Sequence, residues 1–167
     1  MHAEVPQSVL DHADSFKVLP IYIVIDQSWA ASEALDAINN LRISTVIREC
    51  IKNPLLDEIL RFTIIGFNDR TEIVSSLTRG SHLSRHTFVP SGASTFSDMF
   101  SLLRSQLEAD YSLLKGEGYM VYRPHVFLLA DGEPLDEPSA EFADLVPPNF
   151  ARGPHIWLIP IEGVVGV

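Results

Sequence analysis

The sequence predicts an α/β domain with a doubly wound, mainly parallel sheet and one antiparallel edge strand. Three observations predict this class. Residues 19–25 are almost wholly apolar and β-branched, which is typical of a strand buried on both faces. Comparable runs recur later in the chain, at 61–67, 125–130 and 156–161. Stretches with apolar residues at helical spacing separate most of these runs, as parallel pairing requires.

Before the first strand, residues 1–18 are polar and contain Pro6, so we expect a flexible N-terminal arm. Residues 19–167 form one domain of ordinary size. A helix is expected from Ser32 onwards, ended by Asn53-Pro54. Its predicted buried face combines residues at spacings of three and four: Leu35, Ile38, Leu41, Thr45, Val46 and Cys50.

The second half of the chain also alternates between predicted strands and predicted helices. The strand at 61–67 is followed by a turn and by residues 71–77, which alternate as a returning edge strand does. A second helix begins after the small-residue loop 91–95, with Ser94 or Thr95 as its expected cap. A strand at 125–130, a short helix and a last strand at 156–161 complete the order.

The composition argues against several classes of function. The net charge is −10, from 22 acidic and 12 basic residues, which argues against nucleic acid or an anionic membrane as the partner. The single Cys50 excludes an internal disulfide and a multi-cysteine zinc site. No segment reaches the roughly 18 apolar residues of a membrane span, and the first residues do not resemble a secretory signal. A cytoplasmic location is therefore expected.

Polar side chains converge on one edge of the predicted sheet. Asp26 and Ser28 directly follow the first strand, and Asp131 with Gly132 follows the strand at 125–130. The loop from Gly92 to Thr95 opens a helix beside them. Because parallel strands place their carboxyl ends at one edge, where open α/β sheets bind ligands, these groups predict the functional site.

This arrangement resembles the von Willebrand factor type A (vWA) domain, a Rossmann-like fold, and its metal-ion-dependent adhesion site. In that family the first strand ends in Asp-x-Ser-x-Ser, a loop supplies a Thr after Gly, and a later strand ends in Asp. The resemblance covers residues 19–163 and is greatest to the bacterial tellurium-resistance TerY type. The segments that carry it are Leu19-Pro-Ile-Tyr-Ile-Val-Ile-Asp26, Ala37-Ile-Asn-Asn40, Ser91-Gly92 and Phe127-Leu-Leu-Ala-Asp-Gly-Glu-Pro134.

Two positions depart from the family pattern. Ala30 stands where the family has the second Ser, and Ala93 stands directly after Gly92, where the family has Thr. The resemblance therefore implies a degenerate Mg²⁺ site held by Asp26, Ser28 and Asp131. Ser94 and Thr95 are the expected substitutes for the lost hydroxyls, and a cation that keeps several waters tolerates such losses.

The predicted proximity of Asp26 and Asp131 has an electrostatic consequence. Two carboxylates that share a site disfavour each other's ionisation. We therefore expect the site either to bind a cation, or to keep one carboxylate protonated or hydrogen-bonded to Ser28 and Ser94.

The resemblance implies a non-enzymatic protein-interaction module that binds a partner through a carboxylate of that partner. The binding is expected near the Mg²⁺ site at the rim, by which we mean the edge of the sheet with Asp26, Ser28, the loop 92–95 and Asp131. Trp29 and Glu133 are the expected partner-binding residues, and a tellurium-resistance-like stress system is the implied context. A structural scaffold with a vestigial metal site is the alternative. A Mg-dependent phosphatase is less favoured, because such enzymes need a second carboxylate where Ser28 stands.

The chain continues only briefly after the strand at 156–161, whereas the family usually adds a helix and a strand. We therefore expect an uncovered apolar surface there, available for self-association or for a partner.

Overall fold

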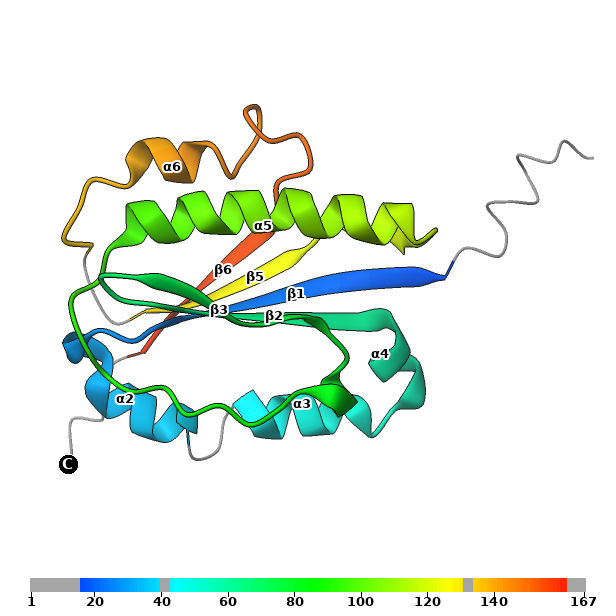
Figure 1. Ribbon diagram of the computed structural model, residues 1–167, viewed down its shortest axis with the longest axis horizontal. Helices are drawn as coiled ribbons and strands as arrows, with labels where there is room; N and C mark the ends of the chain where they lie inside the picture. Colours follow the sequence, from blue (N-terminus) through cyan, green and yellow to red (C-terminus); the bar gives the residue numbers. More distant parts are fainter. Residues whose placement is uncertain (1–15, 40–42, 131–133, 162–167) are drawn as a thin grey trace, which may run out of the picture.

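The computed structural model describes residues 16–39, 43–130 and 134–161, and these form a central sheet between two layers of helices (Figure 1). The strand order is β3-β2-β1-β5-β6, with the short β4 beside the start of β1. The strands are β1 (Lys17–Asp26), β2 (Leu60–Phe67), β3 (Thr71–Thr78), β4 (Met120–Val121), β5 (His125–Ala130) and β6 (His155–Pro160). The α-helices are α2 (Ser32–Ala37), α3 (Ile43–Ile51), α4 (Pro54–Ile59), α5 (Phe96–Gly116) and α6 (Ser139–Ala143).

The pairing confirms the predicted fold class. β1 pairs parallel with β2 and with β5, β5 pairs parallel with β6, and β3 runs antiparallel along the outer side of β2. In this register Asp26 lies opposite Phe67, and Ala130 lies opposite Pro160. The carboxyl ends of the parallel strands therefore meet at one edge of the sheet.

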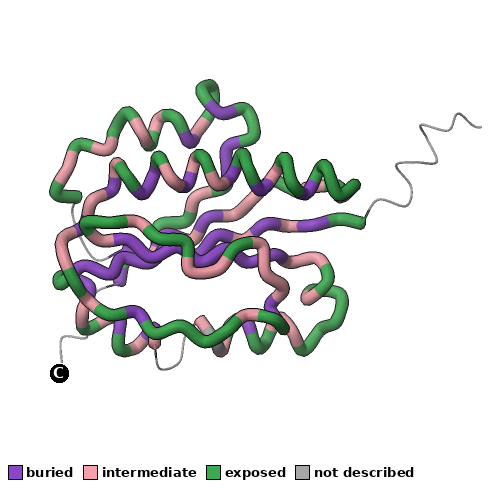
Figure 2. The backbone as a smooth tube through the Cα atoms, viewed as in Figure 1, coloured by how far each residue is buried: buried purple, intermediate pink, exposed green. Residues whose placement is uncertain are grey.

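Apolar side chains from both faces of the sheet form two cores. Alternate residues of β1, such as Tyr22 and Val24, pack against α5. Ile23 and Ile25 point the other way and pack with residues of α2 and α3. Figure 2 shows the result: burial is concentrated in the central strands, and exposed residues follow the outer faces of the helices. β1 is thus the two-sided buried strand that its composition predicts.

Three local predictions need correction. β1 begins at Lys17, and Val18 is fully buried, so two residues of the predicted arm belong to the sheet. Residues 1–15 lie outside the described part of the chain. In the predicted helix after Ser32, the α-helical part of the first segment ends at Ala37 and α3 begins at Ile43, with residues 40–42 outside the described part of the chain.

The third correction concerns Asn53-Pro54, which begins a helix as well as ending one. The Asn53 side chain accepts a hydrogen bond from the Leu55 amide at 3.0 Å, and Pro54 occupies the first position of α4, where its missing N–H is not needed.

The buried face of α3 also differs from the predicted one. Ile47 is buried, and Ile43 and Ile51 pack beside it, whereas Val46, which was expected on the buried face, is 61% exposed.

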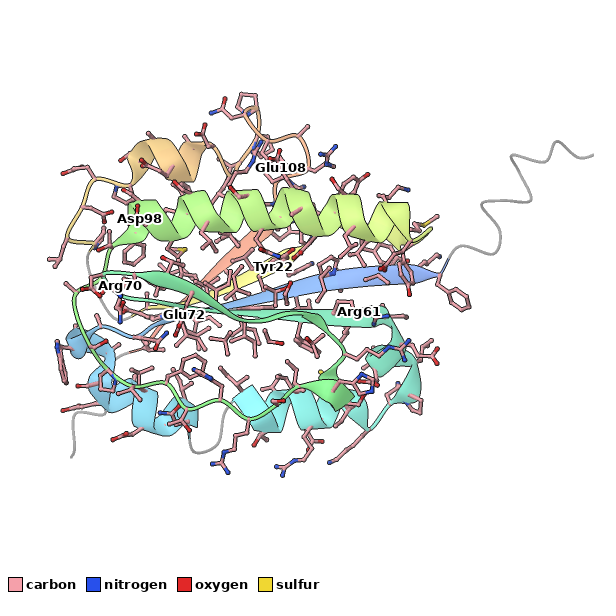
Figure 3. All side chains as sticks on the ribbon, in the orientation of Figure 1. Tyr22, Arg61, Arg70, Glu72, Asp98 and Glu108 are labelled. Atoms are coloured by element: carbon pink, nitrogen blue, oxygen red, sulfur yellow. The ribbon has the colours of Figure 1, made fainter. Side chains whose placement is uncertain are left out.

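Under α5 lies a buried polar network. The Tyr22 hydroxyl donates to Oδ2 of Asp110 at 2.6 Å, and Gln106 Nε2 donates to Oδ1 at 2.6 Å. Burial raises the pKa of the Asp110 carboxyl above its ordinary value, although hydrogen bonds from Tyr22 and Gln106 act in the opposite direction. Tyr22 lies between the sheet and α5 in Figure 3.

No helix within the described residues is both long enough and apolar enough to cross a bilayer.

We expect Asp110→Asn to alter how stability depends on pH. Since the folded-state pKa of Asp110 is raised, its proton stabilises the fold fully below the unfolded value of 3.8, and this stabilisation is lost as pH rises through the folded value. The variant cannot ionise at this position, so its unfolding free energy should increase relative to that of the native chain between pH 4 and pH 7. Urea denaturation at both pH values measures this, with Glu117→Gln as the exposed control. An equal variant-minus-native difference at the two pH values would contradict the assignment.

Candidate functional site

Asp26, the last residue of β1, is the centre of the candidate site. Its side chain is fully buried. Oδ1 accepts a hydrogen bond from the backbone amide of Ser28 at 2.8 Å, and Oδ2 accepts one from the Ser94 hydroxyl at 2.8 Å. The carboxylate is therefore held in one orientation by groups from two separate segments, which is how a buried charge is tolerated.

Most buried polar groups in folded proteins have a hydrogen-bond partner, and the neighbouring Ser28 hydroxyl is an exception among the described residues. Ser28 is 1% exposed, and within residues 16–39, 43–130 and 134–161 its Oγ has no hydrogen-bond partner. A buried hydroxyl without a partner loses its hydration and gains nothing in return, a cost of roughly 1–3 kcal/mol. A buried oxygen next to a fixed carboxylate has the chemistry of a cation ligand.

Backbone hydrogen bonds fasten the loop after β1 to its neighbours. The Gln27 amide donates to the Phe67 carbonyl at 2.7 Å, and the Ser91 amide donates to the Gln27 carbonyl at 2.8 Å. The Trp29 amide donates to the Gly92 carbonyl at 3.2 Å. The end of β1 thus lies between the end of β2 and the loop that leads into α5.

Gly92 sets the course of that loop. Its φ of 65° lies in the left-handed region, and a Cβ at this position would be 2.6 Å from Oδ1 of Asp69. Only glycine fits this backbone without strain. The loop then brings Ser94, not Ala93, to Asp26, so the hydroxyl absent from Ala93 is supplied one residue later. The Thr95 backbone amide donates instead to the Asn68 carbonyl at 3.0 Å.

Asp136 is a rim residue that the sequence analysis missed. Its Oδ1 accepts from the Phe96 amide at 3.0 Å, and its Oδ2 accepts from the Ser97 amide at 2.7 Å. Asp136 therefore caps α5, whereas Thr95 occupies the N-cap position without a side-chain bond. Burial alone would raise the pKa of Asp136, but the hydrogen bonds from Ser97 and Phe96 hold it below its ordinary value.

The other predicted site residues are placed as follows. Trp29 opens the short 3-10 helix η1 (Trp29–Ala31) and is 65% exposed, directly beside the buried Ser28. Ala30 is also on η1 and is exposed. Asp131 and Glu133 lie outside the described residues. The Leu135 amide, just beyond them, donates to the Ser94 carbonyl at 3.3 Å, so the chain returns to the rim after β5.

The donors that are brought together are one carboxylate and two hydroxyls. Among the described residues no cluster of three or more His, Cys, Asp or Glu side chains could hold a metal ion. The donor set, from Asp26, Ser28 and Ser94, consists wholly of oxygen atoms, which favours a hard cation such as Mg²⁺ over zinc. The orphaned Ser28 Oγ and the fixed Asp26 fit such an ion.

Comparison with solved structures supports the fold. A mussel byssus protein, proximal thread matrix protein 1 with a zinc-occupied MIDAS motif, matches 87% of this chain and 38% of its own, at a TM-score of 0.56 and 14% identity. The vWF domain of the type V pili tip protein Mfa5 from Porphyromonas gingivalis matches 71% of this chain and 39% of its own, with a TM-score of 0.50 and 12% sequence identity. The chain thus has the vWA fold and spans well under half the length of these structures. No family model and no curated protein matches it.

We expect Ser28→Ala to stabilise the metal-free protein, because it removes a buried hydroxyl that has no partner among the described residues and leaves the hydrogen bond from the residue 28 amide to Asp26 in place. The gain should be about 1 kcal/mol in unfolding free energy. Urea denaturation in the presence of a chelator measures it. Ser94→Ala is the matched comparison, since it removes a bonded hydroxyl and should destabilise by about 1–3 kcal/mol. A Ser28→Ala variant as destabilised as Ser94→Ala would show that the Ser28 hydroxyl has a partner.

Proposed function

We propose that this chain is a non-enzymatic protein-interaction module of vWA type, and that its partner binds at the rim around Asp26. The observation that carries the proposal is the buried Ser28 hydroxyl next to the fixed Asp26 carboxylate, for which the described part of the chain supplies no hydrogen-bond partner. Trp29, exposed beside them, supplies an aromatic surface of the kind that anchors protein interfaces. A polar site with an adjacent aromatic anchor suits recognition of another protein.

The rim is proposed to hold Mg²⁺ through Ser28 and Asp26, with Ser94 and Asp131 contributing directly or through water. Bound there, the ion would supply a positive charge with an open coordination position. The protein's own part is to hold the oxygen atoms in place: Ser94 and the Ser28 amide fix Asp26, and Ser28 is buried at the start of η1.

The charge of the site predicts what the partner contributes. Asp26 is a buried carboxylate in a chain of net charge −10, so a partner carboxylate would be repelled from a metal-free rim. The same partner would be attracted once a divalent cation is present. Binding through an acidic partner residue should therefore depend on the cation, with Trp29 and Glu133 contributing specificity.

A scaffold with a vestigial metal site is the second candidate, and one observation favours it. Both oxygens of Asp26 already accept hydrogen bonds from protein groups, so the carboxylate is satisfied without a cation. A phosphatase has no such support, because Ser28 occupies the position of the second carboxylate. The tellurium-resistance-like stress context and the cytoplasmic location remain predictions from the sequence resemblance.

Metal titration by calorimetry, paired with affinity capture from native cells, tests the proposal. We expect Mg²⁺ or Mn²⁺ to bind below about 10 mM and Asp26→Asn to abolish binding, because the fixed carboxylate is lost. Trp29→Ala should keep the metal and lose the partner. Asp98→Asn, exposed on α5, is the matched control and should keep both. Failure of the native chain to bind metal, with capture unchanged in Asp26→Asn, would favour the scaffold.

The edge strand β6 carries a separate prediction. Trp157, Leu158 and Ile159 are 52%, 66% and 40% exposed, so the expected apolar surface is present. We expect this surface to drive concentration-dependent self-association, and Leu158→Lys to prevent it, because a charge on an edge strand opposes edge pairing. Light scattering measures the mass against the 18.6 kDa monomer, with Leu113→Lys on α5 as control. A native chain that stays monomeric at low salt would refute self-association.

A further inference from the structure

A cavity of about 340 Å³ lies at the opposite end of the molecule from Asp26. It opens between the second half of α5 and the amino ends of β1 and β5, where Pro20 and Pro124 form part of its wall. Tyr22, labelled in Figure 3, lies at its base between the sheet and α5. No residue of this cavity takes part in the rim described above.

Two arginine side chains line this cavity. The Nε of Arg123 donates to the Gly153 carbonyl at 2.6 Å, which fixes the guanidinium and leaves its two terminal nitrogens for another acceptor. The guanidinium carbon of Arg152 lies 4.3 Å from the centre of the Tyr111 ring. Within the described residues, neither arginine has a carboxylate within 4.0 Å, although acidic residues outnumber basic ones in this chain.

The segment that holds Arg123 is tightly built. A Cβ on Gly153 would be 2.5 Å from the Leu145 carbonyl oxygen and 3.0 Å from the Phe150 carbonyl oxygen. Gly153 therefore allows the backbone a close approach that a larger residue would prevent. The carbonyl that receives Arg123 thus lies in a closely packed part of the chain, so the guanidinium is oriented before any ligand arrives.

The remaining walls are aromatic and uncharged. The rings of Tyr22, Tyr111, Tyr122 and Phe150 line the cavity. Burial raises the pKa of Tyr22 far above its ordinary range, and Asp110 adds to this, so the phenol stays neutral and donates to Asp110. The Tyr22 phenol at the base of the cavity therefore adds no negative charge of its own.

From this geometry we propose that the cavity binds a small aromatic acid, with its carboxylate or phosphate on Arg123 and Arg152 and its ring between the aromatic walls. Guanidinium groups form paired, charge-assisted hydrogen bonds with these anions. The volume is at the lower end of the range for small-molecule sites and suits a ligand with one ring. Apolar walls with a few fixed polar groups are the usual composition of such sites.

Amide-resolved NMR titration of the full chain tests the proposal, with benzoate and phenyl phosphate as probes and benzamide as the uncharged comparison. We expect saturable shifts at Tyr111, Ala151 and Arg152 for the two acids, with little response to benzamide. Arg123→Gln should weaken acid binding roughly tenfold or more, because it removes the oriented charge. Arg85→Gln, exposed in the loop on the other side of the sheet, is the matched control and should bind as the native chain does.

Two outcomes would overturn the proposal. One is the absence of saturable shifts in the native chain with either acid up to about 10 mM, a concentration at which even weak sites are occupied. The other is equal affinity of the native chain and Arg123→Gln, provided that the spectrum of the variant shows the native fold. Neither outcome bears on the Asp26 rim, which is tested with metal ions.

Discussion

Burial of the Asp26 carboxylate is the constraint on which the arrangement of the rim depends. A charge at the end of a strand covered on both faces has lost water and must be met by hydrogen bonds or by a cation. Ser94 and the Ser28 amide supply hydrogen bonds, which requires the loop before α5 to lie against the end of β1. Gly92 makes that path available, and the backbone bonds from Ser91 and Trp29 hold it.

The two ends of the sheet have opposite chemistry. At the carboxyl ends of the strands, Asp26 and Asp136 are acidic groups fixed by amides and a hydroxyl, and the Ser28 oxygen has no partner among the residues that the structure describes. At the amino ends, Arg123 and Arg152 face a cavity with aromatic walls. α5 runs between them: its first turn is capped by Asp136, and Leu107 and Tyr111 in its second half line the cavity. The two proposed sites, for a cation at one edge of the sheet and for an anion at the other, share no residues.

The parts predicted well from the sequence are those specified by local patterns. The apolar runs predict the central strands, which the structure confirms, whereas a functional role for the edge at Asp26 stays a prediction. The errors arise where distant segments meet. Asp136 caps a helix that begins 40 residues earlier, and Tyr22 bonds to Asp110 across 88 positions, so no local spacing reveals either contact. The hydrogen bond from Ser94 to Asp26 is one that the sequence predicts, although the left-handed turn at Gly92 that precedes it is not predicted. Asn53-Pro54 is an ambiguous signal, since the same pair ends one helix and caps the next.

A crystal structure of the protein crystallised with Mn²⁺ would test cation binding at Ser28 and Asp26, because the anomalous signal of manganese identifies the ion and its ligands together. We expect an anomalous peak at coordination distance from the Ser28 hydroxyl, with Asp26 bound to the ion directly or through water. A water molecule or an apolar contact at the Ser28 hydroxyl, with no anomalous peak at the rim of a well-ordered crystal, would contradict it.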